Sequence, residues 1–211
     1  MKFTNEEGKK IVLGIIKSIQ DNKEYLSEID GAIGDGDHGI NMSKGATIAQ
    51  SDVENSKNLT EALGILSKVL MNKIGGSMGP LYGSIFMGMQ EAVMNVEEID
   101  GLVIKEMLNN AYENIKMISP AKPNDKTLVD VLDPSINAYN LTYDATNDTV
   151  KALTECEKAA KEGMLSTINM QARLGRASRL GEKSIGHQDA GATSCYIIIN
   201  TLCNISIELL K

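Results

Sequence analysis

Three aspartates stand close together between Asp30 and Asn41, in the twelve-residue stretch DGAIGDGDHGIN. The stretch also holds four glycines. Because each glycine in a helix costs about 1 kcal/mol relative to alanine, we expect a loop here. Three carboxylates in one tight loop repel one another, and a hard divalent cation with oxygen ligands would offset that repulsion. The pattern predicts that Asp30, Asp35 and Asp37 form a cage for Mg²⁺; the plainer alternative is a polar turn whose aspartates cap helices.

Two known templates fit this stretch poorly. An EF-hand loop counted from Asp35 would have Ile40 where glycine is required and Ala46 where glutamate is required. A G-x-G-x-x-G dinucleotide pattern does occur at residues 34–39. However, Asp35 and Asp37 would repel a pyrophosphate unless a metal bridged them, and no βαβ pattern surrounds the loop. A magnesium site that works with bound phosphates is therefore the favoured interpretation.

Two further glycine clusters could bind phosphate. Residues 75–80, GGSMGP, would expose backbone N–H groups at the start of a helix, and Ser77 could add a hydroxyl donor. A simple helix cap before the proline explains this cluster equally well. In the third cluster, residues 175–191, Arg176 and Arg179 stand three apart and would share one face of a helix. They could contact phosphates, although a solvated face is the more common role for such a pair.

The histidines and cysteines limit which other catalytic or metal sites the chain could form. The only two histidines, His38 and His187, both lie in loops rich in Gly and Asp, so a functional and a structural role are equally open for each. The three cysteines, Cys156, Cys195 and Cys203, lack metal-ligand spacing and are odd in number. We therefore expect all three to be free thiols, in a protein of the reducing cytoplasm.

The overall charge and hydropathy exclude two classes of partner. A formal charge of −7 argues against nucleic-acid binding, which requires a basic face, and the absence of Trp removes the best stacking platform. Near the N-terminus, the apolar run at residues 11–16 is cut by Lys17 and is too short for a membrane span. We therefore expect no nucleic acid and no membrane as partners.

Apolar residues recur at helical spacing along most of the chain, and no segment alternates with period two. The final segment has a β-branched run, but its length and its apolar residues nearly all round favour a buried helix. We expect either Asn58 or Thr60 to cap one helix, Asp100 to cap another, and Pro134 to kink or interrupt a third. The sequence predicts one all-α domain, residues 1–211, with helices near 5–27, 41–49, 59–72, 81–93, 101–118, 126–143, 149–171 and 193–210.

Long helices joined by glycine-rich polar loops suggest where a site would form. Successive antiparallel helices place alternate loops at the same end of a bundle. The three glycine clusters are separated by regions that can hold whole pairs of helices, so we expect them to meet at one mouth.

Five motifs occur in order along the chain: GDGDHG with Asn41 at 34–41, GGS-x-GP at 75–80, DKT-x-x-D at 125–130, GRAS at 175–178 and GHQD-x-GA at 186–192. Taken together, they resemble one known family, the nucleotide-binding L subunits of bacterial dihydroxyacetone kinases. The resemblance spans nearly the whole chain, with the motifs in the family's order.

This resemblance implies a barrel of about eight antiparallel amphipathic helices, with ADP and two Mg²⁺ ions at one end. It implies phosphoryl transfer to dihydroxyacetone held on a separate K subunit, while an M subunit of the phosphotransferase system recharges the bound ADP to ATP. The metals would lie on Asp30, Asp35 and Asp37, and Arg176 would approach the phosphates as the catalytic residue. The nucleotide contacts that the resemblance implies are His38, Gly39, Ile40, Asn41, Ser77, Met78, Gly79, Thr127, Arg176, Asp189, Ala190 and Gly191.

Three positions depart from the family pattern. Met78 stands where a small polar residue is common, Asn124 where Gly often precedes DKT, and Ala190 where Pro is frequent. They bear on the contacts to phosphate and adenine rather than on the metal site.

The leading interpretation is a phosphotransferase-dependent dihydroxyacetone kinase L subunit. One alternative is an ATP-dependent kinase subunit for dihydroxyacetone or another small ketose or polyol. The other is a Mg-nucleotide-binding regulatory module without catalysis, because members of this family contact transcription regulators. The sequence leaves the oligomeric state open, a homodimer included.

Overall fold

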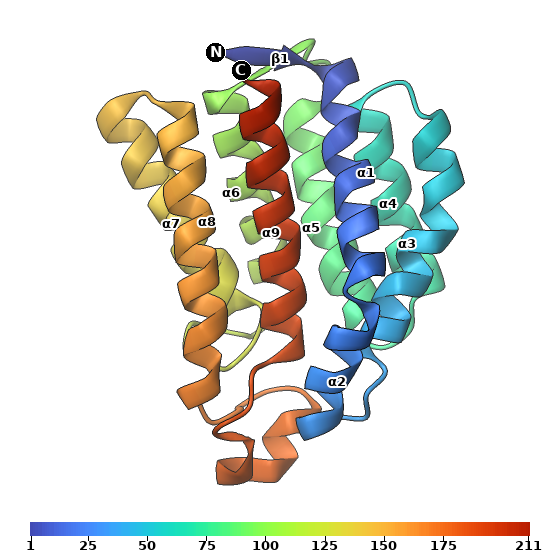
Figure 1. The fold of residues 1–211 in the computed structure, drawn as a ribbon, viewed down its shortest axis with the longest axis vertical. Coiled ribbons are helices and arrows are strands. Elements are labelled where there is room, and N and C mark those ends of the chain that lie inside the picture. The colour runs from blue at the N-terminus through green and yellow to red at the C-terminus, as the bar shows by residue number, and fades with distance from the viewer.

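The computed structural model describes residues 1–211 and is almost entirely helical, which confirms the predicted all-α class (Figure 1). Two 3₁₀ helices, Thr167–Asn169 and Arg176–Ser184, lie between the last two α-helices. The α-helices are α1 Asn5–Asp21, α2 Lys23–Ile33, α3 His38–Asn55, α4 Leu59–Lys73, α5 Met78–Val93, α6 Gly101–Ile118, α7 Val129–Thr146, α8 Thr149–Ser166 and α9 Ala190–Leu209.

A small antiparallel sheet was not expected from the sequence. Strands β1 (Lys2–Thr4) and β2 (Glu98–Asp100) pair so that Phe3 lies opposite Ile99, and both of these side chains are buried. Strands of three residues are too short to show a period-two pattern. The sheet joins the N-terminus to the turn before α6, at the end of the molecule opposite α2 (Figure 1).

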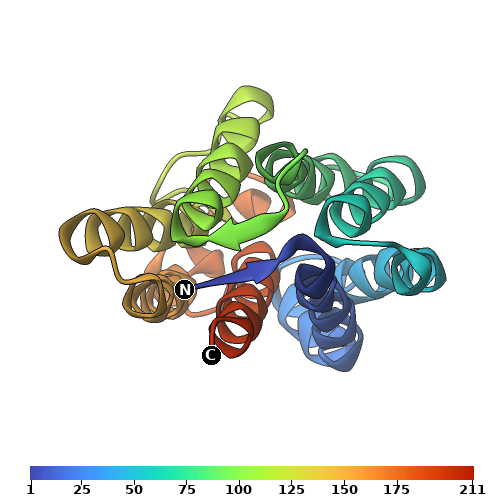
Figure 2. The same ribbon diagram turned by 90° about the horizontal axis from the view of Figure 1, so that it is seen from above.

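Eight of the nine helices form a closed barrel. From α1 the ring passes through α3, α4, α5, α6, α7 and α8 to α9, each helix packing on the next, and α9 packs back on α1 (Figure 2). The ninth helix, α2, lies at one end and packs on α3 and α9. The expected barrel of eight helices is therefore confirmed. One hydrophobic cluster of 46 buried residues fills the core, which supports the proposal that residues 1–211 form one domain.

The position of α9 among its neighbours explains why its sequence is apolar nearly all round. Its residues Ile198, Leu202 and Cys203 belong to the core cluster, and α9 contacts α1, α7 and α8. The predicted buried helix is confirmed. This helix is long and apolar enough to cross a membrane, but 67% of its most apolar window is buried within the barrel, as a core helix requires.

The predicted loop between Asp30 and Asn41 is wrong at both ends. The chain bends at Asn22, between the end of α1 at Asp21 and the start of α2 at Lys23, and α2 continues to Ile33, so that Asp30 lies in its last turn. Helix α3 begins at His38, which leaves only residues 34–37 as loop. Packing explains the difference: a Cβ on Gly39 would lie 1.9 Å from the Lys23 carbonyl oxygen. The glycine allows α3 to approach α2, and this contact outweighs its poor helix propensity.

Proline positions also differ from expectation. Helix α5 begins at Met78, so Pro80 lies within its first turn, where a missing N–H costs nothing. Helix α7 begins at Val129 and runs through Pro134 without interruption. The Asp130 carbonyl, which Pro134 deprives of its helical donor, lies against Gly163 of α8; a Cβ there would lie 2.1 Å from that oxygen.

Candidate functional site

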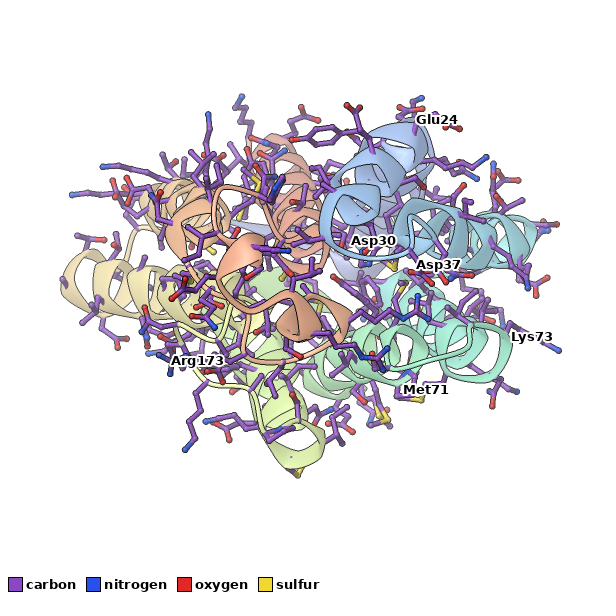
Figure 3. All side chains as sticks on the ribbon, turned by 90° about the horizontal axis from the view of Figure 1, so that it is seen from below. Glu24, Asp30, Asp37, Met71, Lys73 and Arg173 are labelled. Atoms are coloured by element: carbon purple, nitrogen blue, oxygen red, sulfur yellow. The ribbon has the colours of Figure 1, made fainter.

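The three glycine clusters meet, as predicted, at one cavity of about 760 Å³ at the end of the barrel that carries α2. It is lined from the α2–α3 loop, the start of α5, the α6–α7 loop and the start of α9. Residues 167–189, here named the covering segment, lie across this end of the barrel (Figure 3). A cavity of this size suits a ligand as large as a nucleotide.

The three aspartates come together at one side of this cavity. One carboxylate oxygen from each of Asp30, Asp35 and Asp37 lies within 4.8 Å of the other two. Asp30 comes from the last turn of α2 and Asp37 is the residue before α3, as Figure 3 shows. The backbone N–H of His38 donates to Asp30 Oδ2 at 3.2 Å, which fixes that carboxylate. Three convergent carboxylates match the oxygen ligands that Mg²⁺ prefers.

Arg176 faces this carboxylate cluster. Its guanidinium group forms an ion pair with Asp35 and lies 3.7 Å from Asp37 Oδ2. Arg179 is also exposed but forms no salt bridge. The two arginines, which their spacing alone could not separate, therefore differ: of the two, only Arg176 is directed at the candidate metal site.

The start of α5 offers uncapped backbone donors to the cavity. Ser77 precedes α5 without a side-chain capping bond, and Ser77 and Met78 both line the cavity. Gly76 has a φ of +70°, and added Cβ atoms on Gly75 and Gly76 would meet nothing. Free N–H groups at a helix N-terminus bind anions readily, so this turn can hold a phosphate.

The start of α9 also lines the cavity. Asp189 caps α9 by accepting a hydrogen bond from the Ala192 N–H at 2.7 Å, and Ala190 and Gly191 lie beside it. Burial raises the pKa of Asp189 to about 6, although the Ala192 N–H and the nearby Lys126 ammonium both favour the charged form. The carboxylate is therefore poorly stabilised in this pocket.

A buried polar network, which the sequence did not reveal, lies at the wall of the cavity. His38 Nε2 lies 2.7 Å from Ser194 Oγ, and the Tyr82 hydroxyl lies 2.5 Å from the same oxygen. Tyr82 also donates to the Gly191 carbonyl at 2.9 Å. Burial lowers the pKa of His38 to about 4, so its ring is neutral at pH 7. The network fixes the start of α9 against α3 and α5, and His38 also lines the cavity, so its contact with the nucleotide stays a prediction.

The α6–α7 loop adopts an unusual backbone. Asn124 and Lys126 have φ values of +74° and +61°, a conformation that side-chain-bearing residues rarely adopt. The Asp130 carboxylate stabilises this turn by accepting from the N–H groups of Asn124 and Thr127. Asparagine tolerates the left-handed region, which explains how it can stand where Gly is common. Thr127 thereby reaches the cavity wall.

The other predicted nucleotide contacts differ in whether they reach the cavity. Asn41 lines the cavity, whereas Gly39, Ile40 and Gly79 do not. Ile40 is 53% exposed, and Gly79 packs where a Cβ would lie 2.3 Å from the Ile74 carbonyl. The role of these three residues in binding stays a prediction. His187 is exposed and outside the cavity.

The sequence matches the DAK2 domain over residues 32–204. The chain belongs to the DAK2 domain family. It is 35% identical over 192 residues to the PEP-dependent dihydroxyacetone kinase 1, ADP-binding subunit DhaL of Listeria innocua, covering 90% of this chain and 91% of that protein. It is 38% identical over 191 residues to the PTS-dependent dihydroxyacetone kinase, ADP-binding subunit DhaL of Lactococcus lactis, with the same two coverages.

The fold of this DAK2 domain also occurs in a larger enzyme. The crystal structure of the dihydroxyacetone kinase of C. freundii superposes with a TM-score of 0.68 at 21% sequence identity. The match covers 93% of this DAK2 domain but only 34% of that chain, and at this identity it establishes the fold alone. The cavity residues other than Asp30 all lie within the matched DAK2 region.

Proposed function

We propose that this DAK2 domain is the ADP-binding subunit of a dihydroxyacetone kinase, with tightly bound ADP/ATP as its cofactor. The observation that carries the proposal is the convergence of the three glycine clusters on one cavity, beside a triad of carboxylates. The relatives named above, which are ADP-binding subunits of such kinases, match over nine-tenths of the chain and support the same activity.

Asp30, Asp35 and Asp37 would hold the metal, with two Mg²⁺ ions as the proposed number. Their oxygen atoms are close enough to share cations, and no basic side chain other than Arg176 forms a salt bridge with them. Bound Mg²⁺ would neutralise the charge of the phosphates. The chain itself contributes backbone N–H groups at the start of α5, where Ser77 and Met78 line the cavity.

Arg176 is the proposed catalytic residue. Phosphoryl transfer depends on positioning and on charge stabilisation more than on covalent chemistry with the protein. A guanidinium offers a planar fork of donors that matches phosphate oxygens. Arg176 already lies at the carboxylate cluster, on an exposed segment, so it can follow the phosphoryl group as it passes to an acceptor at the mouth.

The acceptor would be dihydroxyacetone on a separate K subunit, and the donor an M subunit of the phosphotransferase system that takes phosphoryl groups from phosphoenolpyruvate. A contact with a transcription regulator and a homodimer are further proposals about the assembly. All three cysteines are free and buried, which supports a cytoplasmic location for this complex.

One reconstitution separates the candidate functions. The purified chain, with its K and M partners and dihydroxyacetone, is supplied with either phosphoenolpyruvate or ATP in the presence of catalytic ADP. Turnover with phosphoenolpyruvate alone supports the proposal. Turnover only with stoichiometric ATP would identify an ATP-dependent kinase subunit, and Mg-ADP binding without turnover would identify a regulatory module.

A further inference from the structure

The side chain of Lys126, in the α6–α7 loop, is only 1% exposed. Its ammonium group donates three hydrogen bonds to backbone carbonyls of the covering segment: Met170 at 3.1 Å, Ser184 at 2.5 Å and His187 at 2.7 Å. An ammonium has three donors, and all are used. Because one acceptor lies early in the segment and two lie near its end, a single group joins both ends of the segment to the barrel.

This burial is costly in itself. No carboxylate forms a salt bridge with Lys126, and burial lowers the pKa of its ammonium, while the charge of nearby Asp189 acts in the opposite direction. A buried charge without an ion pair is unfavourable unless hydrogen bonds replace its water. The three carbonyls replace the water around the ammonium. The charge of Lys126 is therefore tolerated only while the covering segment is in place, and the segment is held in place by the same hydrogen bonds.

The backbone is also arranged for this contact. Lys126 has a φ of +61°, within the turn that the Asp130 carboxylate stabilises. Strained conformations of this kind persist where the surrounding structure enforces them, and they concentrate at functional sites. The turn places a long cationic side chain beneath the covering segment, and Lys126 and Thr127 both line the cavity.

The middle of the covering segment packs on α2 through the 3₁₀ helix Arg176–Ser184 and makes few polar contacts with the helices beneath it. The Arg173 N–H donates to the Asp125 carbonyl at 3.2 Å, and the Arg173 side chain lies 3.9 Å from the Asp125 carboxylate. Arg176 pairs with the carboxylate cluster through an exposed side chain. Exposed pairs such as these contribute little.

We propose that Lys126 is a positioning residue, whose ammonium group holds the covering segment over the cavity and thereby places Arg176 and Asp189 beside the ligand. The part concerning the ligand rests on the proposed function, because it takes a Mg-bound nucleoside diphosphate as the occupant. Loss of the ammonium should free the segment, shorten the residence of the nucleotide and leave the barrel intact.

Limited trypsin digestion of the ligand-free protein tests whether Lys126 holds the covering segment in place. The segment offers four exposed cleavage sites, Arg173, Arg176, Arg179 and Lys183. In Lys126→Met, which keeps the length of the side chain but removes its donors, cleavage at these sites should become at least about tenfold faster, the factor expected from losing one charge-assisted hydrogen bond. The matched control is Lys122→Met, an exposed lysine in the same loop, which should be cleaved as the wild type is.

A chemical rescue separates the ammonium from a merely structural effect. The native cysteines are all buried, whereas position 126 should become accessible once the covering segment is freed, so Lys126→Cys can be alkylated with 2-bromoethylamine to rebuild an ammonium of nearly the same reach. Alkylation should restore slow cleavage and slow release of Mg-ADP. Should Lys126→Met fail to fold, Lys126→Gln keeps two donors and should show intermediate cleavage. Loss of helix content in both variants would place Lys126 in the core of the fold and overturn the proposal.

The outcomes separate this inference from the proposed function. Wild-type cleavage rates in folded Lys126→Met, or unchanged release of Mg-ADP from it, would overturn the proposal that Lys126 holds the covering segment. If the wild-type chain does not bind Mg-ADP at all, the proposed function fails, while the digestion of the ligand-free proteins still decides whether Lys126 holds the segment.

Discussion

Arg176→Ala should slow phosphoryl transfer far more than it weakens nucleotide retention. The guanidinium lies against Asp35 and Asp37 at the edge of the cavity. Ground-state ADP would already be neutralised by the proposed Mg²⁺, so an added cation matters most while the phosphoryl group moves. An interaction made mainly in the transition state lowers turnover with little change in binding.

The structure sets the size of each effect. The Arg176 side chain is 58% exposed, and exposed ion pairs contribute at most about 1 kcal/mol, so the free energy of unfolding should hardly change. A charge-assisted hydrogen bond to a phosphate is worth about 1.5–3 kcal/mol. If it is made in the transition state, its loss lowers turnover by roughly 10- to 150-fold.

The assay compares Arg176→Ala with Arg179→Ala, the neighbouring exposed arginine without a salt bridge. Turnover is measured with the K and M partners and dihydroxyacetone, and bound nucleotide is measured in the purified proteins. The Arg179 variant should match the wild type in both. Unchanged turnover in Arg176→Ala, or equal losses in the two variants, would refute the catalytic role of Arg176.

Three further predictions test the site and its framework. Asp35→Ala or Asp37→Ala should abolish bound nucleotide and activity while circular dichroism stays unchanged, because both lie at the half-exposed loop; tight ADP binding that survives in excess chelator would exclude the metal cage. Burial raises the Asp189 pKa from 3.8 to about 6. Between these two pH values the folded wild type holds a proton that the unfolded chain has released, so the wild type loses stability as the pH rises from 3.8 to about 6. Relative to wild type, Asp189→Asn should therefore gain about 1–3 kcal/mol in urea unfolding between pH 4 and pH 7, and a constant difference would contradict this. Gly39→Ala should destabilise by about 1–3 kcal/mol, because its Cβ would lie 1.9 Å from a carbonyl oxygen of α2, whereas Gly75→Ala, with open space around it, should melt as the wild type does.

Helical periodicity predicted the barrel well because its signal is local. The apolar face of each long segment is visible in the sequence. Asp100 caps its helix as expected, and of the two candidates Asn58 and Thr60 it is Asn58 that caps the other, each side chain accepting from the first turn of its helix. The meeting of the glycine clusters followed from the alternation of antiparallel helices. The ring contains eight helices, and the ninth arises only from the bend at Asn22.

The remaining features depend on contacts between distant segments. Gly39 is helical because α2 passes against it, which its own propensity argues against. A lysine in a loop is normally exposed, so the burial of Lys126 under carbonyls 44 to 61 residues away has no signal in a single sequence. The same holds for Tyr82 and Ser194, which are 112 residues apart and meet at the wall of the cavity.

The central claim is that the carboxylate cluster holds ADP through a metal. Isothermal titration of ADP into nucleotide-free protein, with Mg²⁺ and again with excess EDTA, tests it directly. Binding with Mg²⁺ should be one to one, and removing the metal should weaken it at least about a hundredfold, since unscreened phosphates would then face three carboxylates. Equal affinity under the two conditions would contradict the account.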